Sequence, residues 1–483
     1  MYTLPRLQVL KTKTDTIAEF KGLNERAAIE DDELADCYNV SLENAPALSV
    51  RDGYEEYIAP EALGDMWVRS VRDHMIIKHN DVWKLSFFDR TTGLRRTEEI
   101  SLSEDVPIGF DLYNNELYFL LEPDADGTFY LKSFDFMYTI KPVGTVKTHV
   151  ITGTEVFNEY DGKSPVCFMA FGNRMIIAYK GEIAISFDDN ISDWTTYKVE
   201  GYATEECAQR FQLLDDGDFI SCVNYRDYPI FFKKNSMYIL YGEYAPFSLS
   251  RIDSVGCPYP DTIAVCNGAL YFLSKLGVME YTGGTPKLIS QNVNLPSVSS
   301  LNGHTACADN RYYYIANLAF DTYTRTWSKT FMDSAEIDPE VVSSRLEYYP
   351  QCYFDNQVYF LITENVYDPG ASQITYRSIV HTSEEQSCDW SFTTKQFHEY
   401  QAGKKIISRL VVGFENVGLS ELKIEVSLDK GDFKTVYTWD GSKDFVKEVP
   451  VILPPCDYFQ LRVSGTGKVY VHYIKRIYRV LGR

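Results

Sequence analysis

The feature that most constrains this chain is a β-rich unit that recurs along its middle. Each copy has a small polar turn centred on Asn or Asp, an apolar or aromatic strand, a short break and a second strand. The copies are RDHMIIKHNDVWKLSFF (72–88), NNELYFLL (114–121), GNRMIIAYKGEIAISF (172–187), RDYPIFFKKNSMYILYG (226–242), NGALYFLSKLGVMEYTG (267–283), DNRYYYIANLAFDTYTRTW (309–327) and DNQVYFLITENVYD (355–368). Their central turn residues are Asp73, Asn115, Asn173, Asp227, Asn267, Asn310 and Asn356. These turns follow one another at intervals of 40 to 58 residues, so the unit has a roughly constant length.

The mean interval is about 47 residues, which is the length of a four-stranded propeller blade. One such unit cannot bury both of its faces, whereas units set around an axis pack on their neighbours and closure removes long exposed edges. The 36 Tyr and 28 Phe of the chain also favour strands, and Asn or Asp suits turns that need a positive φ. We therefore predict an all-β fold, a β-propeller of about six to eight blades. The alternative is an irregular β-sandwich array whose hairpins look alike.

Closing such a ring requires a strand from one end of the repeat to complete a blade begun at the other. The segment ALSVRDGYEEYI (47–58) has a strand, a turn and an alternating strand, and we expect it to pair within 350–390. The predicted organisation is an N-terminal arm (1–46), the β-propeller (47–394) and a small C-terminal β-sandwich (395–483).

The N-terminal arm begins with an alternating segment, RLQVLKTKT, in which Leu7 and Val9 share one side, and later becomes strongly acidic at 30–36. Alone it buries little. One reading has it cross the propeller surface or add a strand to a neighbouring subunit. The other reading has it fold back on its own chain.

The C-terminal part breaks the repeat and predicts a small antiparallel sandwich. Its strand candidates are 407–415, 422–430, 433–440 and 445–453, followed by a final hairpin in which Gly465-Thr466-Gly467 turns the chain into 468–482. Basic residues gather in this last segment: Lys475, Arg476, Arg479 and Arg483. On an acidic chain, this local change to positive charge predicts a contact with an acidic partner surface, or else a solvated final strand.

The chain of 483 residues carries a formal charge of -21, which argues against a surface that grips a nucleic-acid backbone. No window holds the apolar run that a membrane span or a secretion signal needs. The ten cysteines include no C-x-x-C pair, so we expect free, mostly buried thiols in a protein made in a reducing cytoplasm.

The sequence offers little catalytic or ligand-binding chemistry, and we predict no catalytic residue, no cofactor and no metal site. The histidines have no zinc-site spacing, and there is no nucleophile elbow, Walker loop or dinucleotide motif. Two acidic stretches ending in Trp, 185–194 and 427–439, are interpreted as structural hairpins rather than glycosidase turns. The acidic loops at Asp188 to Asn190 and Asp215 to Asp218 have oxygen ligands for Ca²⁺ but lack the EF-hand pattern.

The order of several motifs resembles the tail hub or nozzle β-propeller proteins of short-tailed bacteriophages and prophages. The opening combines FKGLN (20–24), NVS (39–41) and LSVRDGY (48–54), and is similar to a G-L-N, N, L-x-x-R-x-G entry segment. Segments 171–194, 217–242 and 268–281 and the closing 462–482 are similar to that group too. The better-known nozzle proteins carry large insertions that this shorter chain lacks.

The resemblance implies a structural virion protein and not an enzyme. It implies self-assembly into a ring, usually of six copies, in contact with the portal or adaptor and with other tail proteins. DNA would be only a passenger through the channel, and the location would be the virion tail, after synthesis in the bacterial host cytoplasm. The acidic charge agrees with a wall that repels DNA. As partner contacts we nominate Leu7, Val9, Leu23, Asn24, Lys475, Arg476 and Arg479.

Two other functions stay open at this stage. The first is a carbohydrate-active propeller, either a glycoside hydrolase or a lectin, in which Tyr and Trp at the blade rims stack on sugars. Hydrolysis would need two carboxylates about 5 to 9.5 Å apart facing one pocket. The second is a propeller scaffold for cytoplasmic protein partners.

Overall fold

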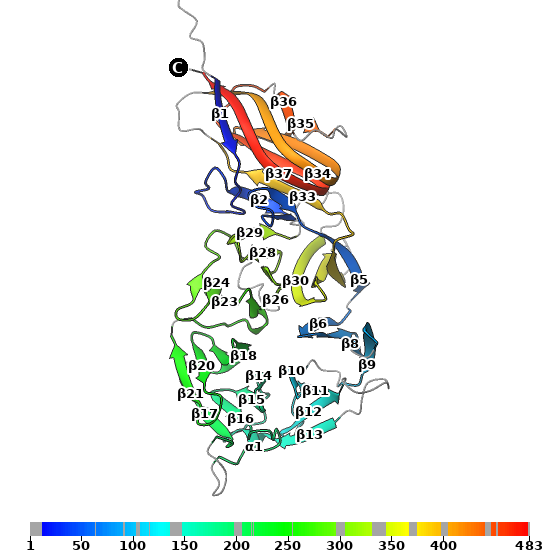
Figure 1. Ribbon diagram of the computed structural model, residues 1–483, viewed down its shortest axis with the longest axis vertical. Helices are drawn as coiled ribbons and strands as arrows, with labels where there is room; N and C mark the ends of the chain where they lie inside the picture. Colours follow the sequence, from blue (N-terminus) through cyan, green and yellow to red (C-terminus); the bar gives the residue numbers. More distant parts are fainter. Residues whose placement is uncertain are drawn as a thin grey trace, which may run out of the picture.

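The computed structural model is almost entirely β and holds a ring of four-stranded sheets with a curled sheet at one side (Figure 1). It describes residues 12–481 except 63, 90–91, 103–106, 115, 136–146, 198–204, 214, 216, 254, 296–304, 331–343, 367–373, 398–403, 440–445 and 451–452. Within that part, the helical elements are α1 (Gly153–Val156) and the 3-10 turn η1 (Pro260–Thr262). No helix there is long and apolar enough to cross a membrane.

Seven four-stranded antiparallel units, here called blades one to seven, follow the chain around the ring; six are separate sheets, and blade six belongs to a larger one. Blade one consists of β6 (Met66–Val71), β7 (His74–His79), β8 (Val82–Asp89) and β9 (Leu94–Ile100), and blade two of β10 (Gly109–Tyr113), β11 (Glu116–Leu120), β12 (Thr128–Asp135) and β13 (Lys147–Thr152). Blade three consists of β14 (Cys167–Phe171), β15 (Arg174–Tyr179), β16 (Glu182–Ile185) and β17 (Gln209–Gln212), and blade four of β18 (Phe219–Tyr225), β19 (Tyr228–Lys233), β20 (Met237–Tyr241) and β21 (Ser248–Ile252). Blade five consists of β22 (Ala264–Cys266), β23 (Ala269–Ser274), β24 (Gly277–Tyr281) and β25 (Lys287–Leu288), and blade six of β26 (Ala306–Ala308), β27 (Tyr312–Ile315), β28 (Leu318–Asp321) and β29 (Thr326–Lys329). Blade seven consists of β30 (Ser344–Phe354), β31 (Gln357–Val366), β32 (Ile374–Ser383) and β5 (Gly53–Ala62). The predicted propeller is confirmed.

The polar turns that marked the repeat connect the first and second strands of the blades. Asp227 has a φ of 62°, Asn267 of 46° and Asn356 of 61°, which is the left-handed region that Asn and Asp tolerate. Asn115 lies outside the described residues. The repeat was visible because each blade needs the same tight turn at the same place.

The ring closes as predicted, by a strand from the start of the repeat. β5 pairs antiparallel with β32, with Gly53 opposite Ser383 and Ile58 opposite Ile379. Gly53 is required here because a Cβ at this position would lie 2.6 Å from the Gln386 carbonyl oxygen.

Apolar clusters fill the spaces between successive blades. For example, Trp83 and Leu85 of blade one pack with Phe119 and Phe134 of blade two. Blades two and three, three and four, and four and five meet in the same way, as do blades six and seven and blades seven and one. Blades five and six meet through Tyr271 and Tyr313, whose ring centres lie 5.3 Å apart. The ring is therefore held by side-chain packing all the way round.

The C-terminal part is one curled sheet, and its two longest strands run where we expected hairpins. β34 (Lys405–Leu428) and β37 (Phe459–Val480) pair along their length, with β33 (Asp389–Thr394), β35 (Lys434–Thr438) and β36 (Val446–Pro450) beside them. The predicted turn at Gly465-Thr466-Gly467 is wrong, because β37 runs through it. Gly467 has a φ of 94° and its Cβ would lie 2.1 Å from the Gly418 carbonyl oxygen. The glycines thus mark a bend where two strands approach closely.

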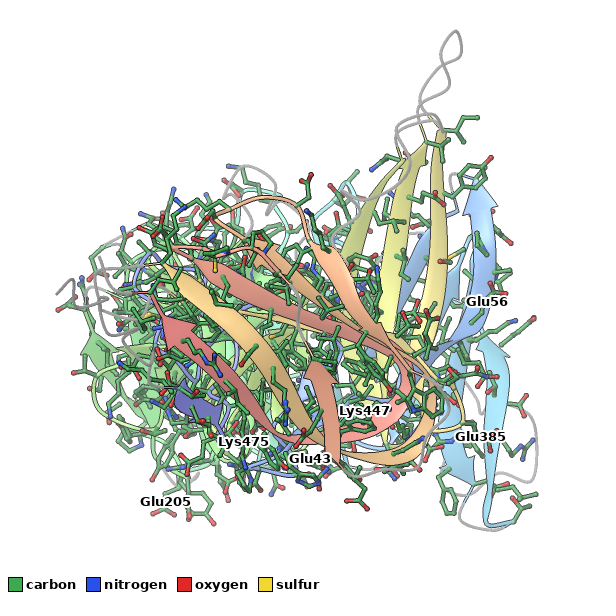
Figure 2. The ribbon with its side chains drawn as sticks, turned by 90° about the horizontal axis from the view of Figure 1, so that it is seen from above. Glu43, Glu56, Glu205, Glu385, Lys447 and Lys475 are labelled. Carbon is green, nitrogen blue, oxygen red and sulfur yellow. The ribbon has the colours of Figure 1, made fainter. Side chains whose placement is uncertain are left out.

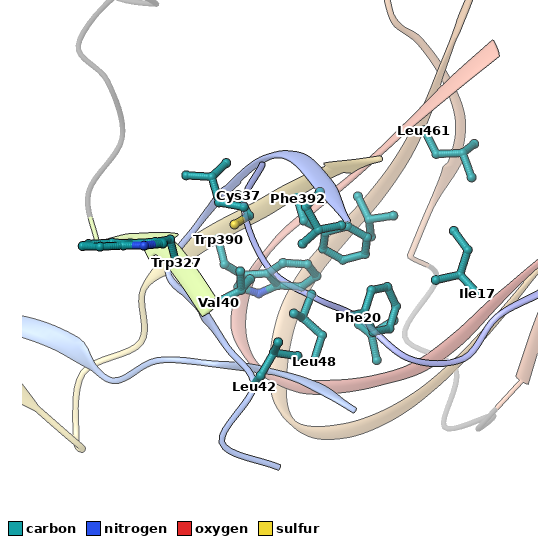
Figure 3. Close-up of a cluster of buried hydrophobic side chains, with 14 of the residues drawn as sticks. Ile17, Phe20, Cys37, Val40, Leu42, Leu48, Trp327, Trp390, Phe392 and Leu461 are labelled. Atoms are coloured by element: carbon teal, nitrogen blue, oxygen red, sulfur yellow. The ribbon is translucent and has the colours of Figure 1, made fainter. Parts of the chain in front are cut away.

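The N-terminal arm folds back on its own chain, which was one of the two readings. β1 (Thr12–Ile17) pairs with β37, and β2 (Leu34–Tyr38) pairs with β33 on one side and β29 on the other. The short strands β3 (Val40–Ser41) and β4 (Leu48–Val50) pair with each other, and β4 also pairs with β37. Figure 3 shows the cluster that anchors the arm, with Phe20, Cys37, Trp390 and Phe392.

All ten cysteines are free thiols, and eight of them are buried, as the sequence predicts.

Candidate functional site

A cavity of about 240 Å³ opens where blades six and seven meet the segment that enters the ring. It lies on the face formed by the turns between the first and second strands of the blades. Hydrogen bonds link successive turns on this face, such as Arg226 Nη2 to the Gly268 carbonyl (2.6 Å) and Asn310 Nδ2 to Tyr353 Oη (3.4 Å). The lining residues are Ser41, Glu43, Arg51, Asp52, Tyr54, Asp309, Asn310, Arg311, Tyr312, Tyr314, Thr330, Tyr353, Asn356, Val358 and Thr382.

Asp309 is fixed at the floor of this pocket by its own turn. Its Oδ1 accepts the backbone N–H groups of Arg311 (2.7 Å) and Tyr312 (2.5 Å), and its Oδ2 accepts the Tyr314 hydroxyl (2.8 Å). Three donors therefore hold this half-buried carboxylate in one orientation.

Arg51 brings the opposite charge to the pocket. Its guanidinium lies 4.1 Å from the centre of the Tyr312 ring, Nε donates to the Val40 carbonyl (3.2 Å), and Nη2 donates to Ser328 Oγ (2.9 Å). No described carboxylate forms an ion pair with Arg51. The side chain is thus held by neutral groups and keeps its charge, because arginine stays protonated in proteins.

Four tyrosines form the walls: Tyr54, Tyr312, Tyr314 and Tyr353. Burial raises the pKa of all four phenols, so they are neutral and can donate at physiological pH. Tyr54 Oη donates to the Thr330 carbonyl (2.9 Å), and Tyr353 Oη donates to Asn356 Oδ1 (3.0 Å). The walls therefore combine flat apolar rings with placed hydroxyls.

The other charged side chains of the pocket are paired. Arg311 donates to Asp321 Oδ2 from Nε (3.0 Å) and Nη2 (2.7 Å), and Asp52 Oδ1 lies 2.9 Å from Lys468 Nζ. Glu43, which Figure 2 labels, is exposed at the rim, with Oε1 4.0 Å from Arg311 Nη1. Among the described residues that line the pocket, Arg51 is thus a cation without an ion pair, and Asp309 is a carboxylate held by neutral donors.

The residues nominated from sequence as partner contacts do not gather at this pocket. Leu7 and Val9 lie outside the described residues. Leu23 and Asn24 are buried, and Asn24 Nδ2 donates to Glu33 Oε2 (2.7 Å) within the arm. These two side chains are therefore packed within this chain, and a role of either in partner contact stays a prediction.

Of the basic residues in the last strand, Arg476 is buried within the chain, Lys475 is half-buried and Arg479 is exposed. Arg476 is 1% exposed, and its guanidinium lies 3.5 Å from the centre of the Phe397 ring and 3.8 Å from Asp15 Oδ2. Arg479 lies opposite Thr12 in the β1–β37 ladder, and Lys475, labelled in Figure 2, lies opposite Thr16. Arg476 therefore joins the acidic arm to the curled sheet.

The acidic loops use their carboxylates internally. Asp188 Oδ1 lies 3.5 Å from Arg174 Nε, and Asp215 accepts the Tyr238 hydroxyl (3.1 Å) and pairs with Arg251. In the described part of the chain, no group of three or more His, Cys, Asp or Glu side chains could hold a metal ion. The stretch ending at Trp194 is a structural turn with a buried indole, as interpreted from sequence.

Sequence reasoning missed the pocket because its parts are far apart along the chain. Arg51 was read as part of a turn before the closing strand and of the entry motif LSVRDGY, and Asp309 and Tyr312 only as parts of a repeat. The one local signal was the excess of Tyr over the repeat consensus in RYYYI, since a blade strand needs only alternate apolar side chains.

No family model and no curated protein matches this chain. Among solved structures, an exo-β-1,3-galactanase from Phanerochaete chrysosporium with β-1,3-galactotriose is 10% identical, over 85% of this chain and 95% of that one, with a TM-score of 0.26. A glycoside hydrolase family 43 arabinoxylan arabinofuranohydrolase from Bacillus subtilis, in complex with cellotetraose, is 10% identical over 78% and 95%, with a TM-score of 0.24. At these scores the matches carry neither substrate nor active-site residues over to this chain.

The comparison corrects two predictions. The solved structures found are glycoside hydrolases and not phage-tail proteins, so the main prediction of a phage-tail structural protein, and with it the prediction of no enzyme, is contradicted. The expected ring assembly, tail partners and virion location stay predictions. The choice of a function for this chain then depends on the chemistry of its own pocket.

Proposed function

We propose that this chain is a carbohydrate-active β-propeller whose pocket between blades six and seven binds one uncharged sugar residue. The observation that carries the proposal is the combination of Arg51 and Asp309 within tyrosine walls. A sugar presents apolar C–H faces together with hydroxyls that both donate and accept, and such a ligand needs flat apolar rings beside charged planar groups.

The size of the cavity limits the ligand. Pockets for drug-sized ligands span about 300 to 1,000 Å³, and this one measures about 240 Å³. A single sugar ring suits that space, and a longer chain would have to leave through the opening.

The charges of the pocket limit the ligand further. Arg51 can donate to hydroxyl oxygens, while the free lone pairs of Asp309 and the exposed carboxylate of Glu43 can accept from hydroxyls. Because groups of both signs, Arg51 and Asp309, line the same pocket, a neutral polyol suits it better than a ligand with a net charge.

Isothermal titration with galactose, glucose, mannose, xylose and arabinose tests the proposal. We expect one or more of them to bind the wild-type protein and Arg51→Gln to abolish that binding. Arg226→Gln is the matched control, because Arg226 lies on the same face and donates to two backbone carbonyls of blade five. Tyr353→Phe removes one wall hydroxyl whose partners are surface side chains, and we expect weaker binding with an unchanged melting temperature.

The proposal fails if none of these sugars binds, or if Arg51→Gln and Tyr353→Phe, both folded by their melting curves, bind as well as the wild type. Product analysis accompanies the titration with the matching oligosaccharides. Hydrolysis by the common route needs two carboxylates, and Glu43, Asp52 and Asp309 are those that line the pocket. Released sugar identifies a hydrolase, and its absence with retained binding identifies a lectin.

A further inference from the structure

Tyr323 is a tyrosine beside the pocket whose ring is 64% exposed. It lies in the turn between β28 and β29, next to the pocket residue Arg311. The centre of its ring is 5.3 Å from the Arg311 guanidinium carbon, and the Tyr312 ring lies 5.5 Å from the same carbon. Arg311 therefore stands between the pocket wall and the exposed ring.

Hydrogen bonds to a buried carboxylate fix the turn that carries Tyr323. Asp321 is 2% exposed, and its Oδ1 accepts the backbone N–H groups of Tyr323 (2.9 Å) and Thr324 (3.2 Å). Its Oδ2 binds Arg311, and Arg311 Nη2 also reaches the Leu42 carbonyl (3.5 Å). One buried carboxylate thus fixes both the ring's backbone and the guanidinium beside it.

Three other exposed tyrosines, Tyr57, Tyr228 and Tyr241, each contact a second tyrosine ring. Tyr228 and Tyr241 lie with ring centres 5.2 Å apart, and Tyr57 meets Tyr359 at 5.3 Å. Within the described residues, no aromatic ring contacts Tyr323. Its ring therefore has an open face next to the pocket, held at a fixed place.

We propose that the pocket takes the end of an oligosaccharide and that the second sugar residue stacks on Tyr323. The inference rests on the proposed function. A chain whose end fills the small cavity must leave over the rim, and a flat ring on that rim offers an apolar surface to the C–H face of the next residue. The guanidinium beside the ring keeps it in place and adds donors for hydroxyls.

The test is the dependence of affinity on chain length, with the mono-, di- and trisaccharide of whichever sugar fills the pocket. Aromatic contacts contribute about 0.5–1.5 kcal/mol, which is about a two- to twelvefold change in the dissociation constant. We expect the wild type to gain about that factor from monosaccharide to disaccharide. Tyr323→Ala removes this gain without changing the affinity for the monosaccharide, and Tyr323→Phe retains it, because stacking needs the ring alone. Tyr244→Ala, at a 58% exposed tyrosine of blade four, is the matched control and changes neither affinity.

The outcomes separate the two proposals. If the monosaccharide binds but the disaccharide binds no better, or if Tyr323→Ala retains the gain, the stacking inference is wrong and the proposed function stands. If no saccharide of any length binds, both are wrong. A loss of monosaccharide affinity in Tyr323→Ala also overturns the inference, because the ring would then belong to the pocket itself.

Discussion

Replacing Phe360 with alanine tests whether the propeller closes as one cooperative ring. Phe360 lies in β31 of blade seven and is fully buried. Its ring meets Tyr54 edge-on at 5.8 Å and Tyr314 edge-on at 5.8 Å. Tyr54 belongs to the closing strand β5, and Tyr314 belongs to blade six. One side chain therefore joins three segments that are far apart in the sequence.

The magnitude follows from that burial. Truncating a buried phenylalanine to alanine costs about 3–5 kcal/mol, which is a large part of a typical unfolding free energy of about 5–15 kcal/mol. Each aromatic contact contributes about 0.5–1.5 kcal/mol. Phe360→Leu, which fills most of the volume but loses both contacts, should therefore cost about 1–3 kcal/mol.

The assay is urea unfolding followed by tryptophan fluorescence, since Trp83, Trp194 and Trp390 are buried and report on separate parts of the chain. Phe88→Ala is the matched control, because Phe88 is 45% exposed on blade one, and we expect a change within about 0.5 kcal/mol. If Phe360→Ala lowers the free energy of unfolding by less than about 1 kcal/mol, the reasoning is refuted, since truncating a core phenylalanine that joins three segments should cost more.

Two further predictions concern acid stability and the curled sheet. Hydrogen bonds from Arg325 (2.8 and 3.0 Å) lower the pKa of Glu280 in the folded state. The ionised Glu280 therefore stabilises the fold fully above about pH 4.5, and this contribution is lost as the pH falls through the lowered folded-state pKa. Melting temperatures between neutral pH and about pH 3 should therefore fall more steeply for the wild type than for Glu280→Gln, and parallel curves would contradict the assignment. In the curled sheet, Gly467→Ala adds a clash with the Gly418 carbonyl to its backbone strain, whereas Gly284→Ala, at a φ of 79° with open space around it, has only strain of about 1–2 kcal/mol. We expect the lower melting temperature for Gly467→Ala, and equal values would show that the two strands do not approach as described.

The repeat could be predicted because each copy depends on residues that are close together in the sequence. Every blade needs a tight turn after its first strand, and residues such as Asp227 and Asn356 supply the positive φ at regular spacing. The closing strand was found for the same reason, since a ring must be completed by a segment with a turn and an alternating pattern at 47–58.

The C-terminal sheet was harder to predict because glycine has two uses in β structure. Gly465 and Gly467 can end a strand in a turn or allow a long strand to bend against a neighbour, and only the close approach of Glu421 and Gly418 decides between them. Whether the arm contacts its own chain or a partner could not be predicted either. Its acidic residues Asp15 and Asp31 suit a basic surface of another protein as well as the chain's own Arg476.

The pocket could not be predicted, because no single segment contains it. Arg51 comes from the entry to the ring, Asp309 from blade six and Tyr353 from blade seven. Each has a structural explanation when read alone, and their meeting depends on ring closure.

The pairing of β2 with both β29 and β33 has a mechanical consequence. Blade six and the curled sheet are one hydrogen-bonded surface, so a force applied to the curled sheet is passed through backbone bonds directly to the blade that carries Asp309. Bending of the curled sheet is therefore transmitted to the wall of the pocket through the pairing of Tyr38 with Lys329.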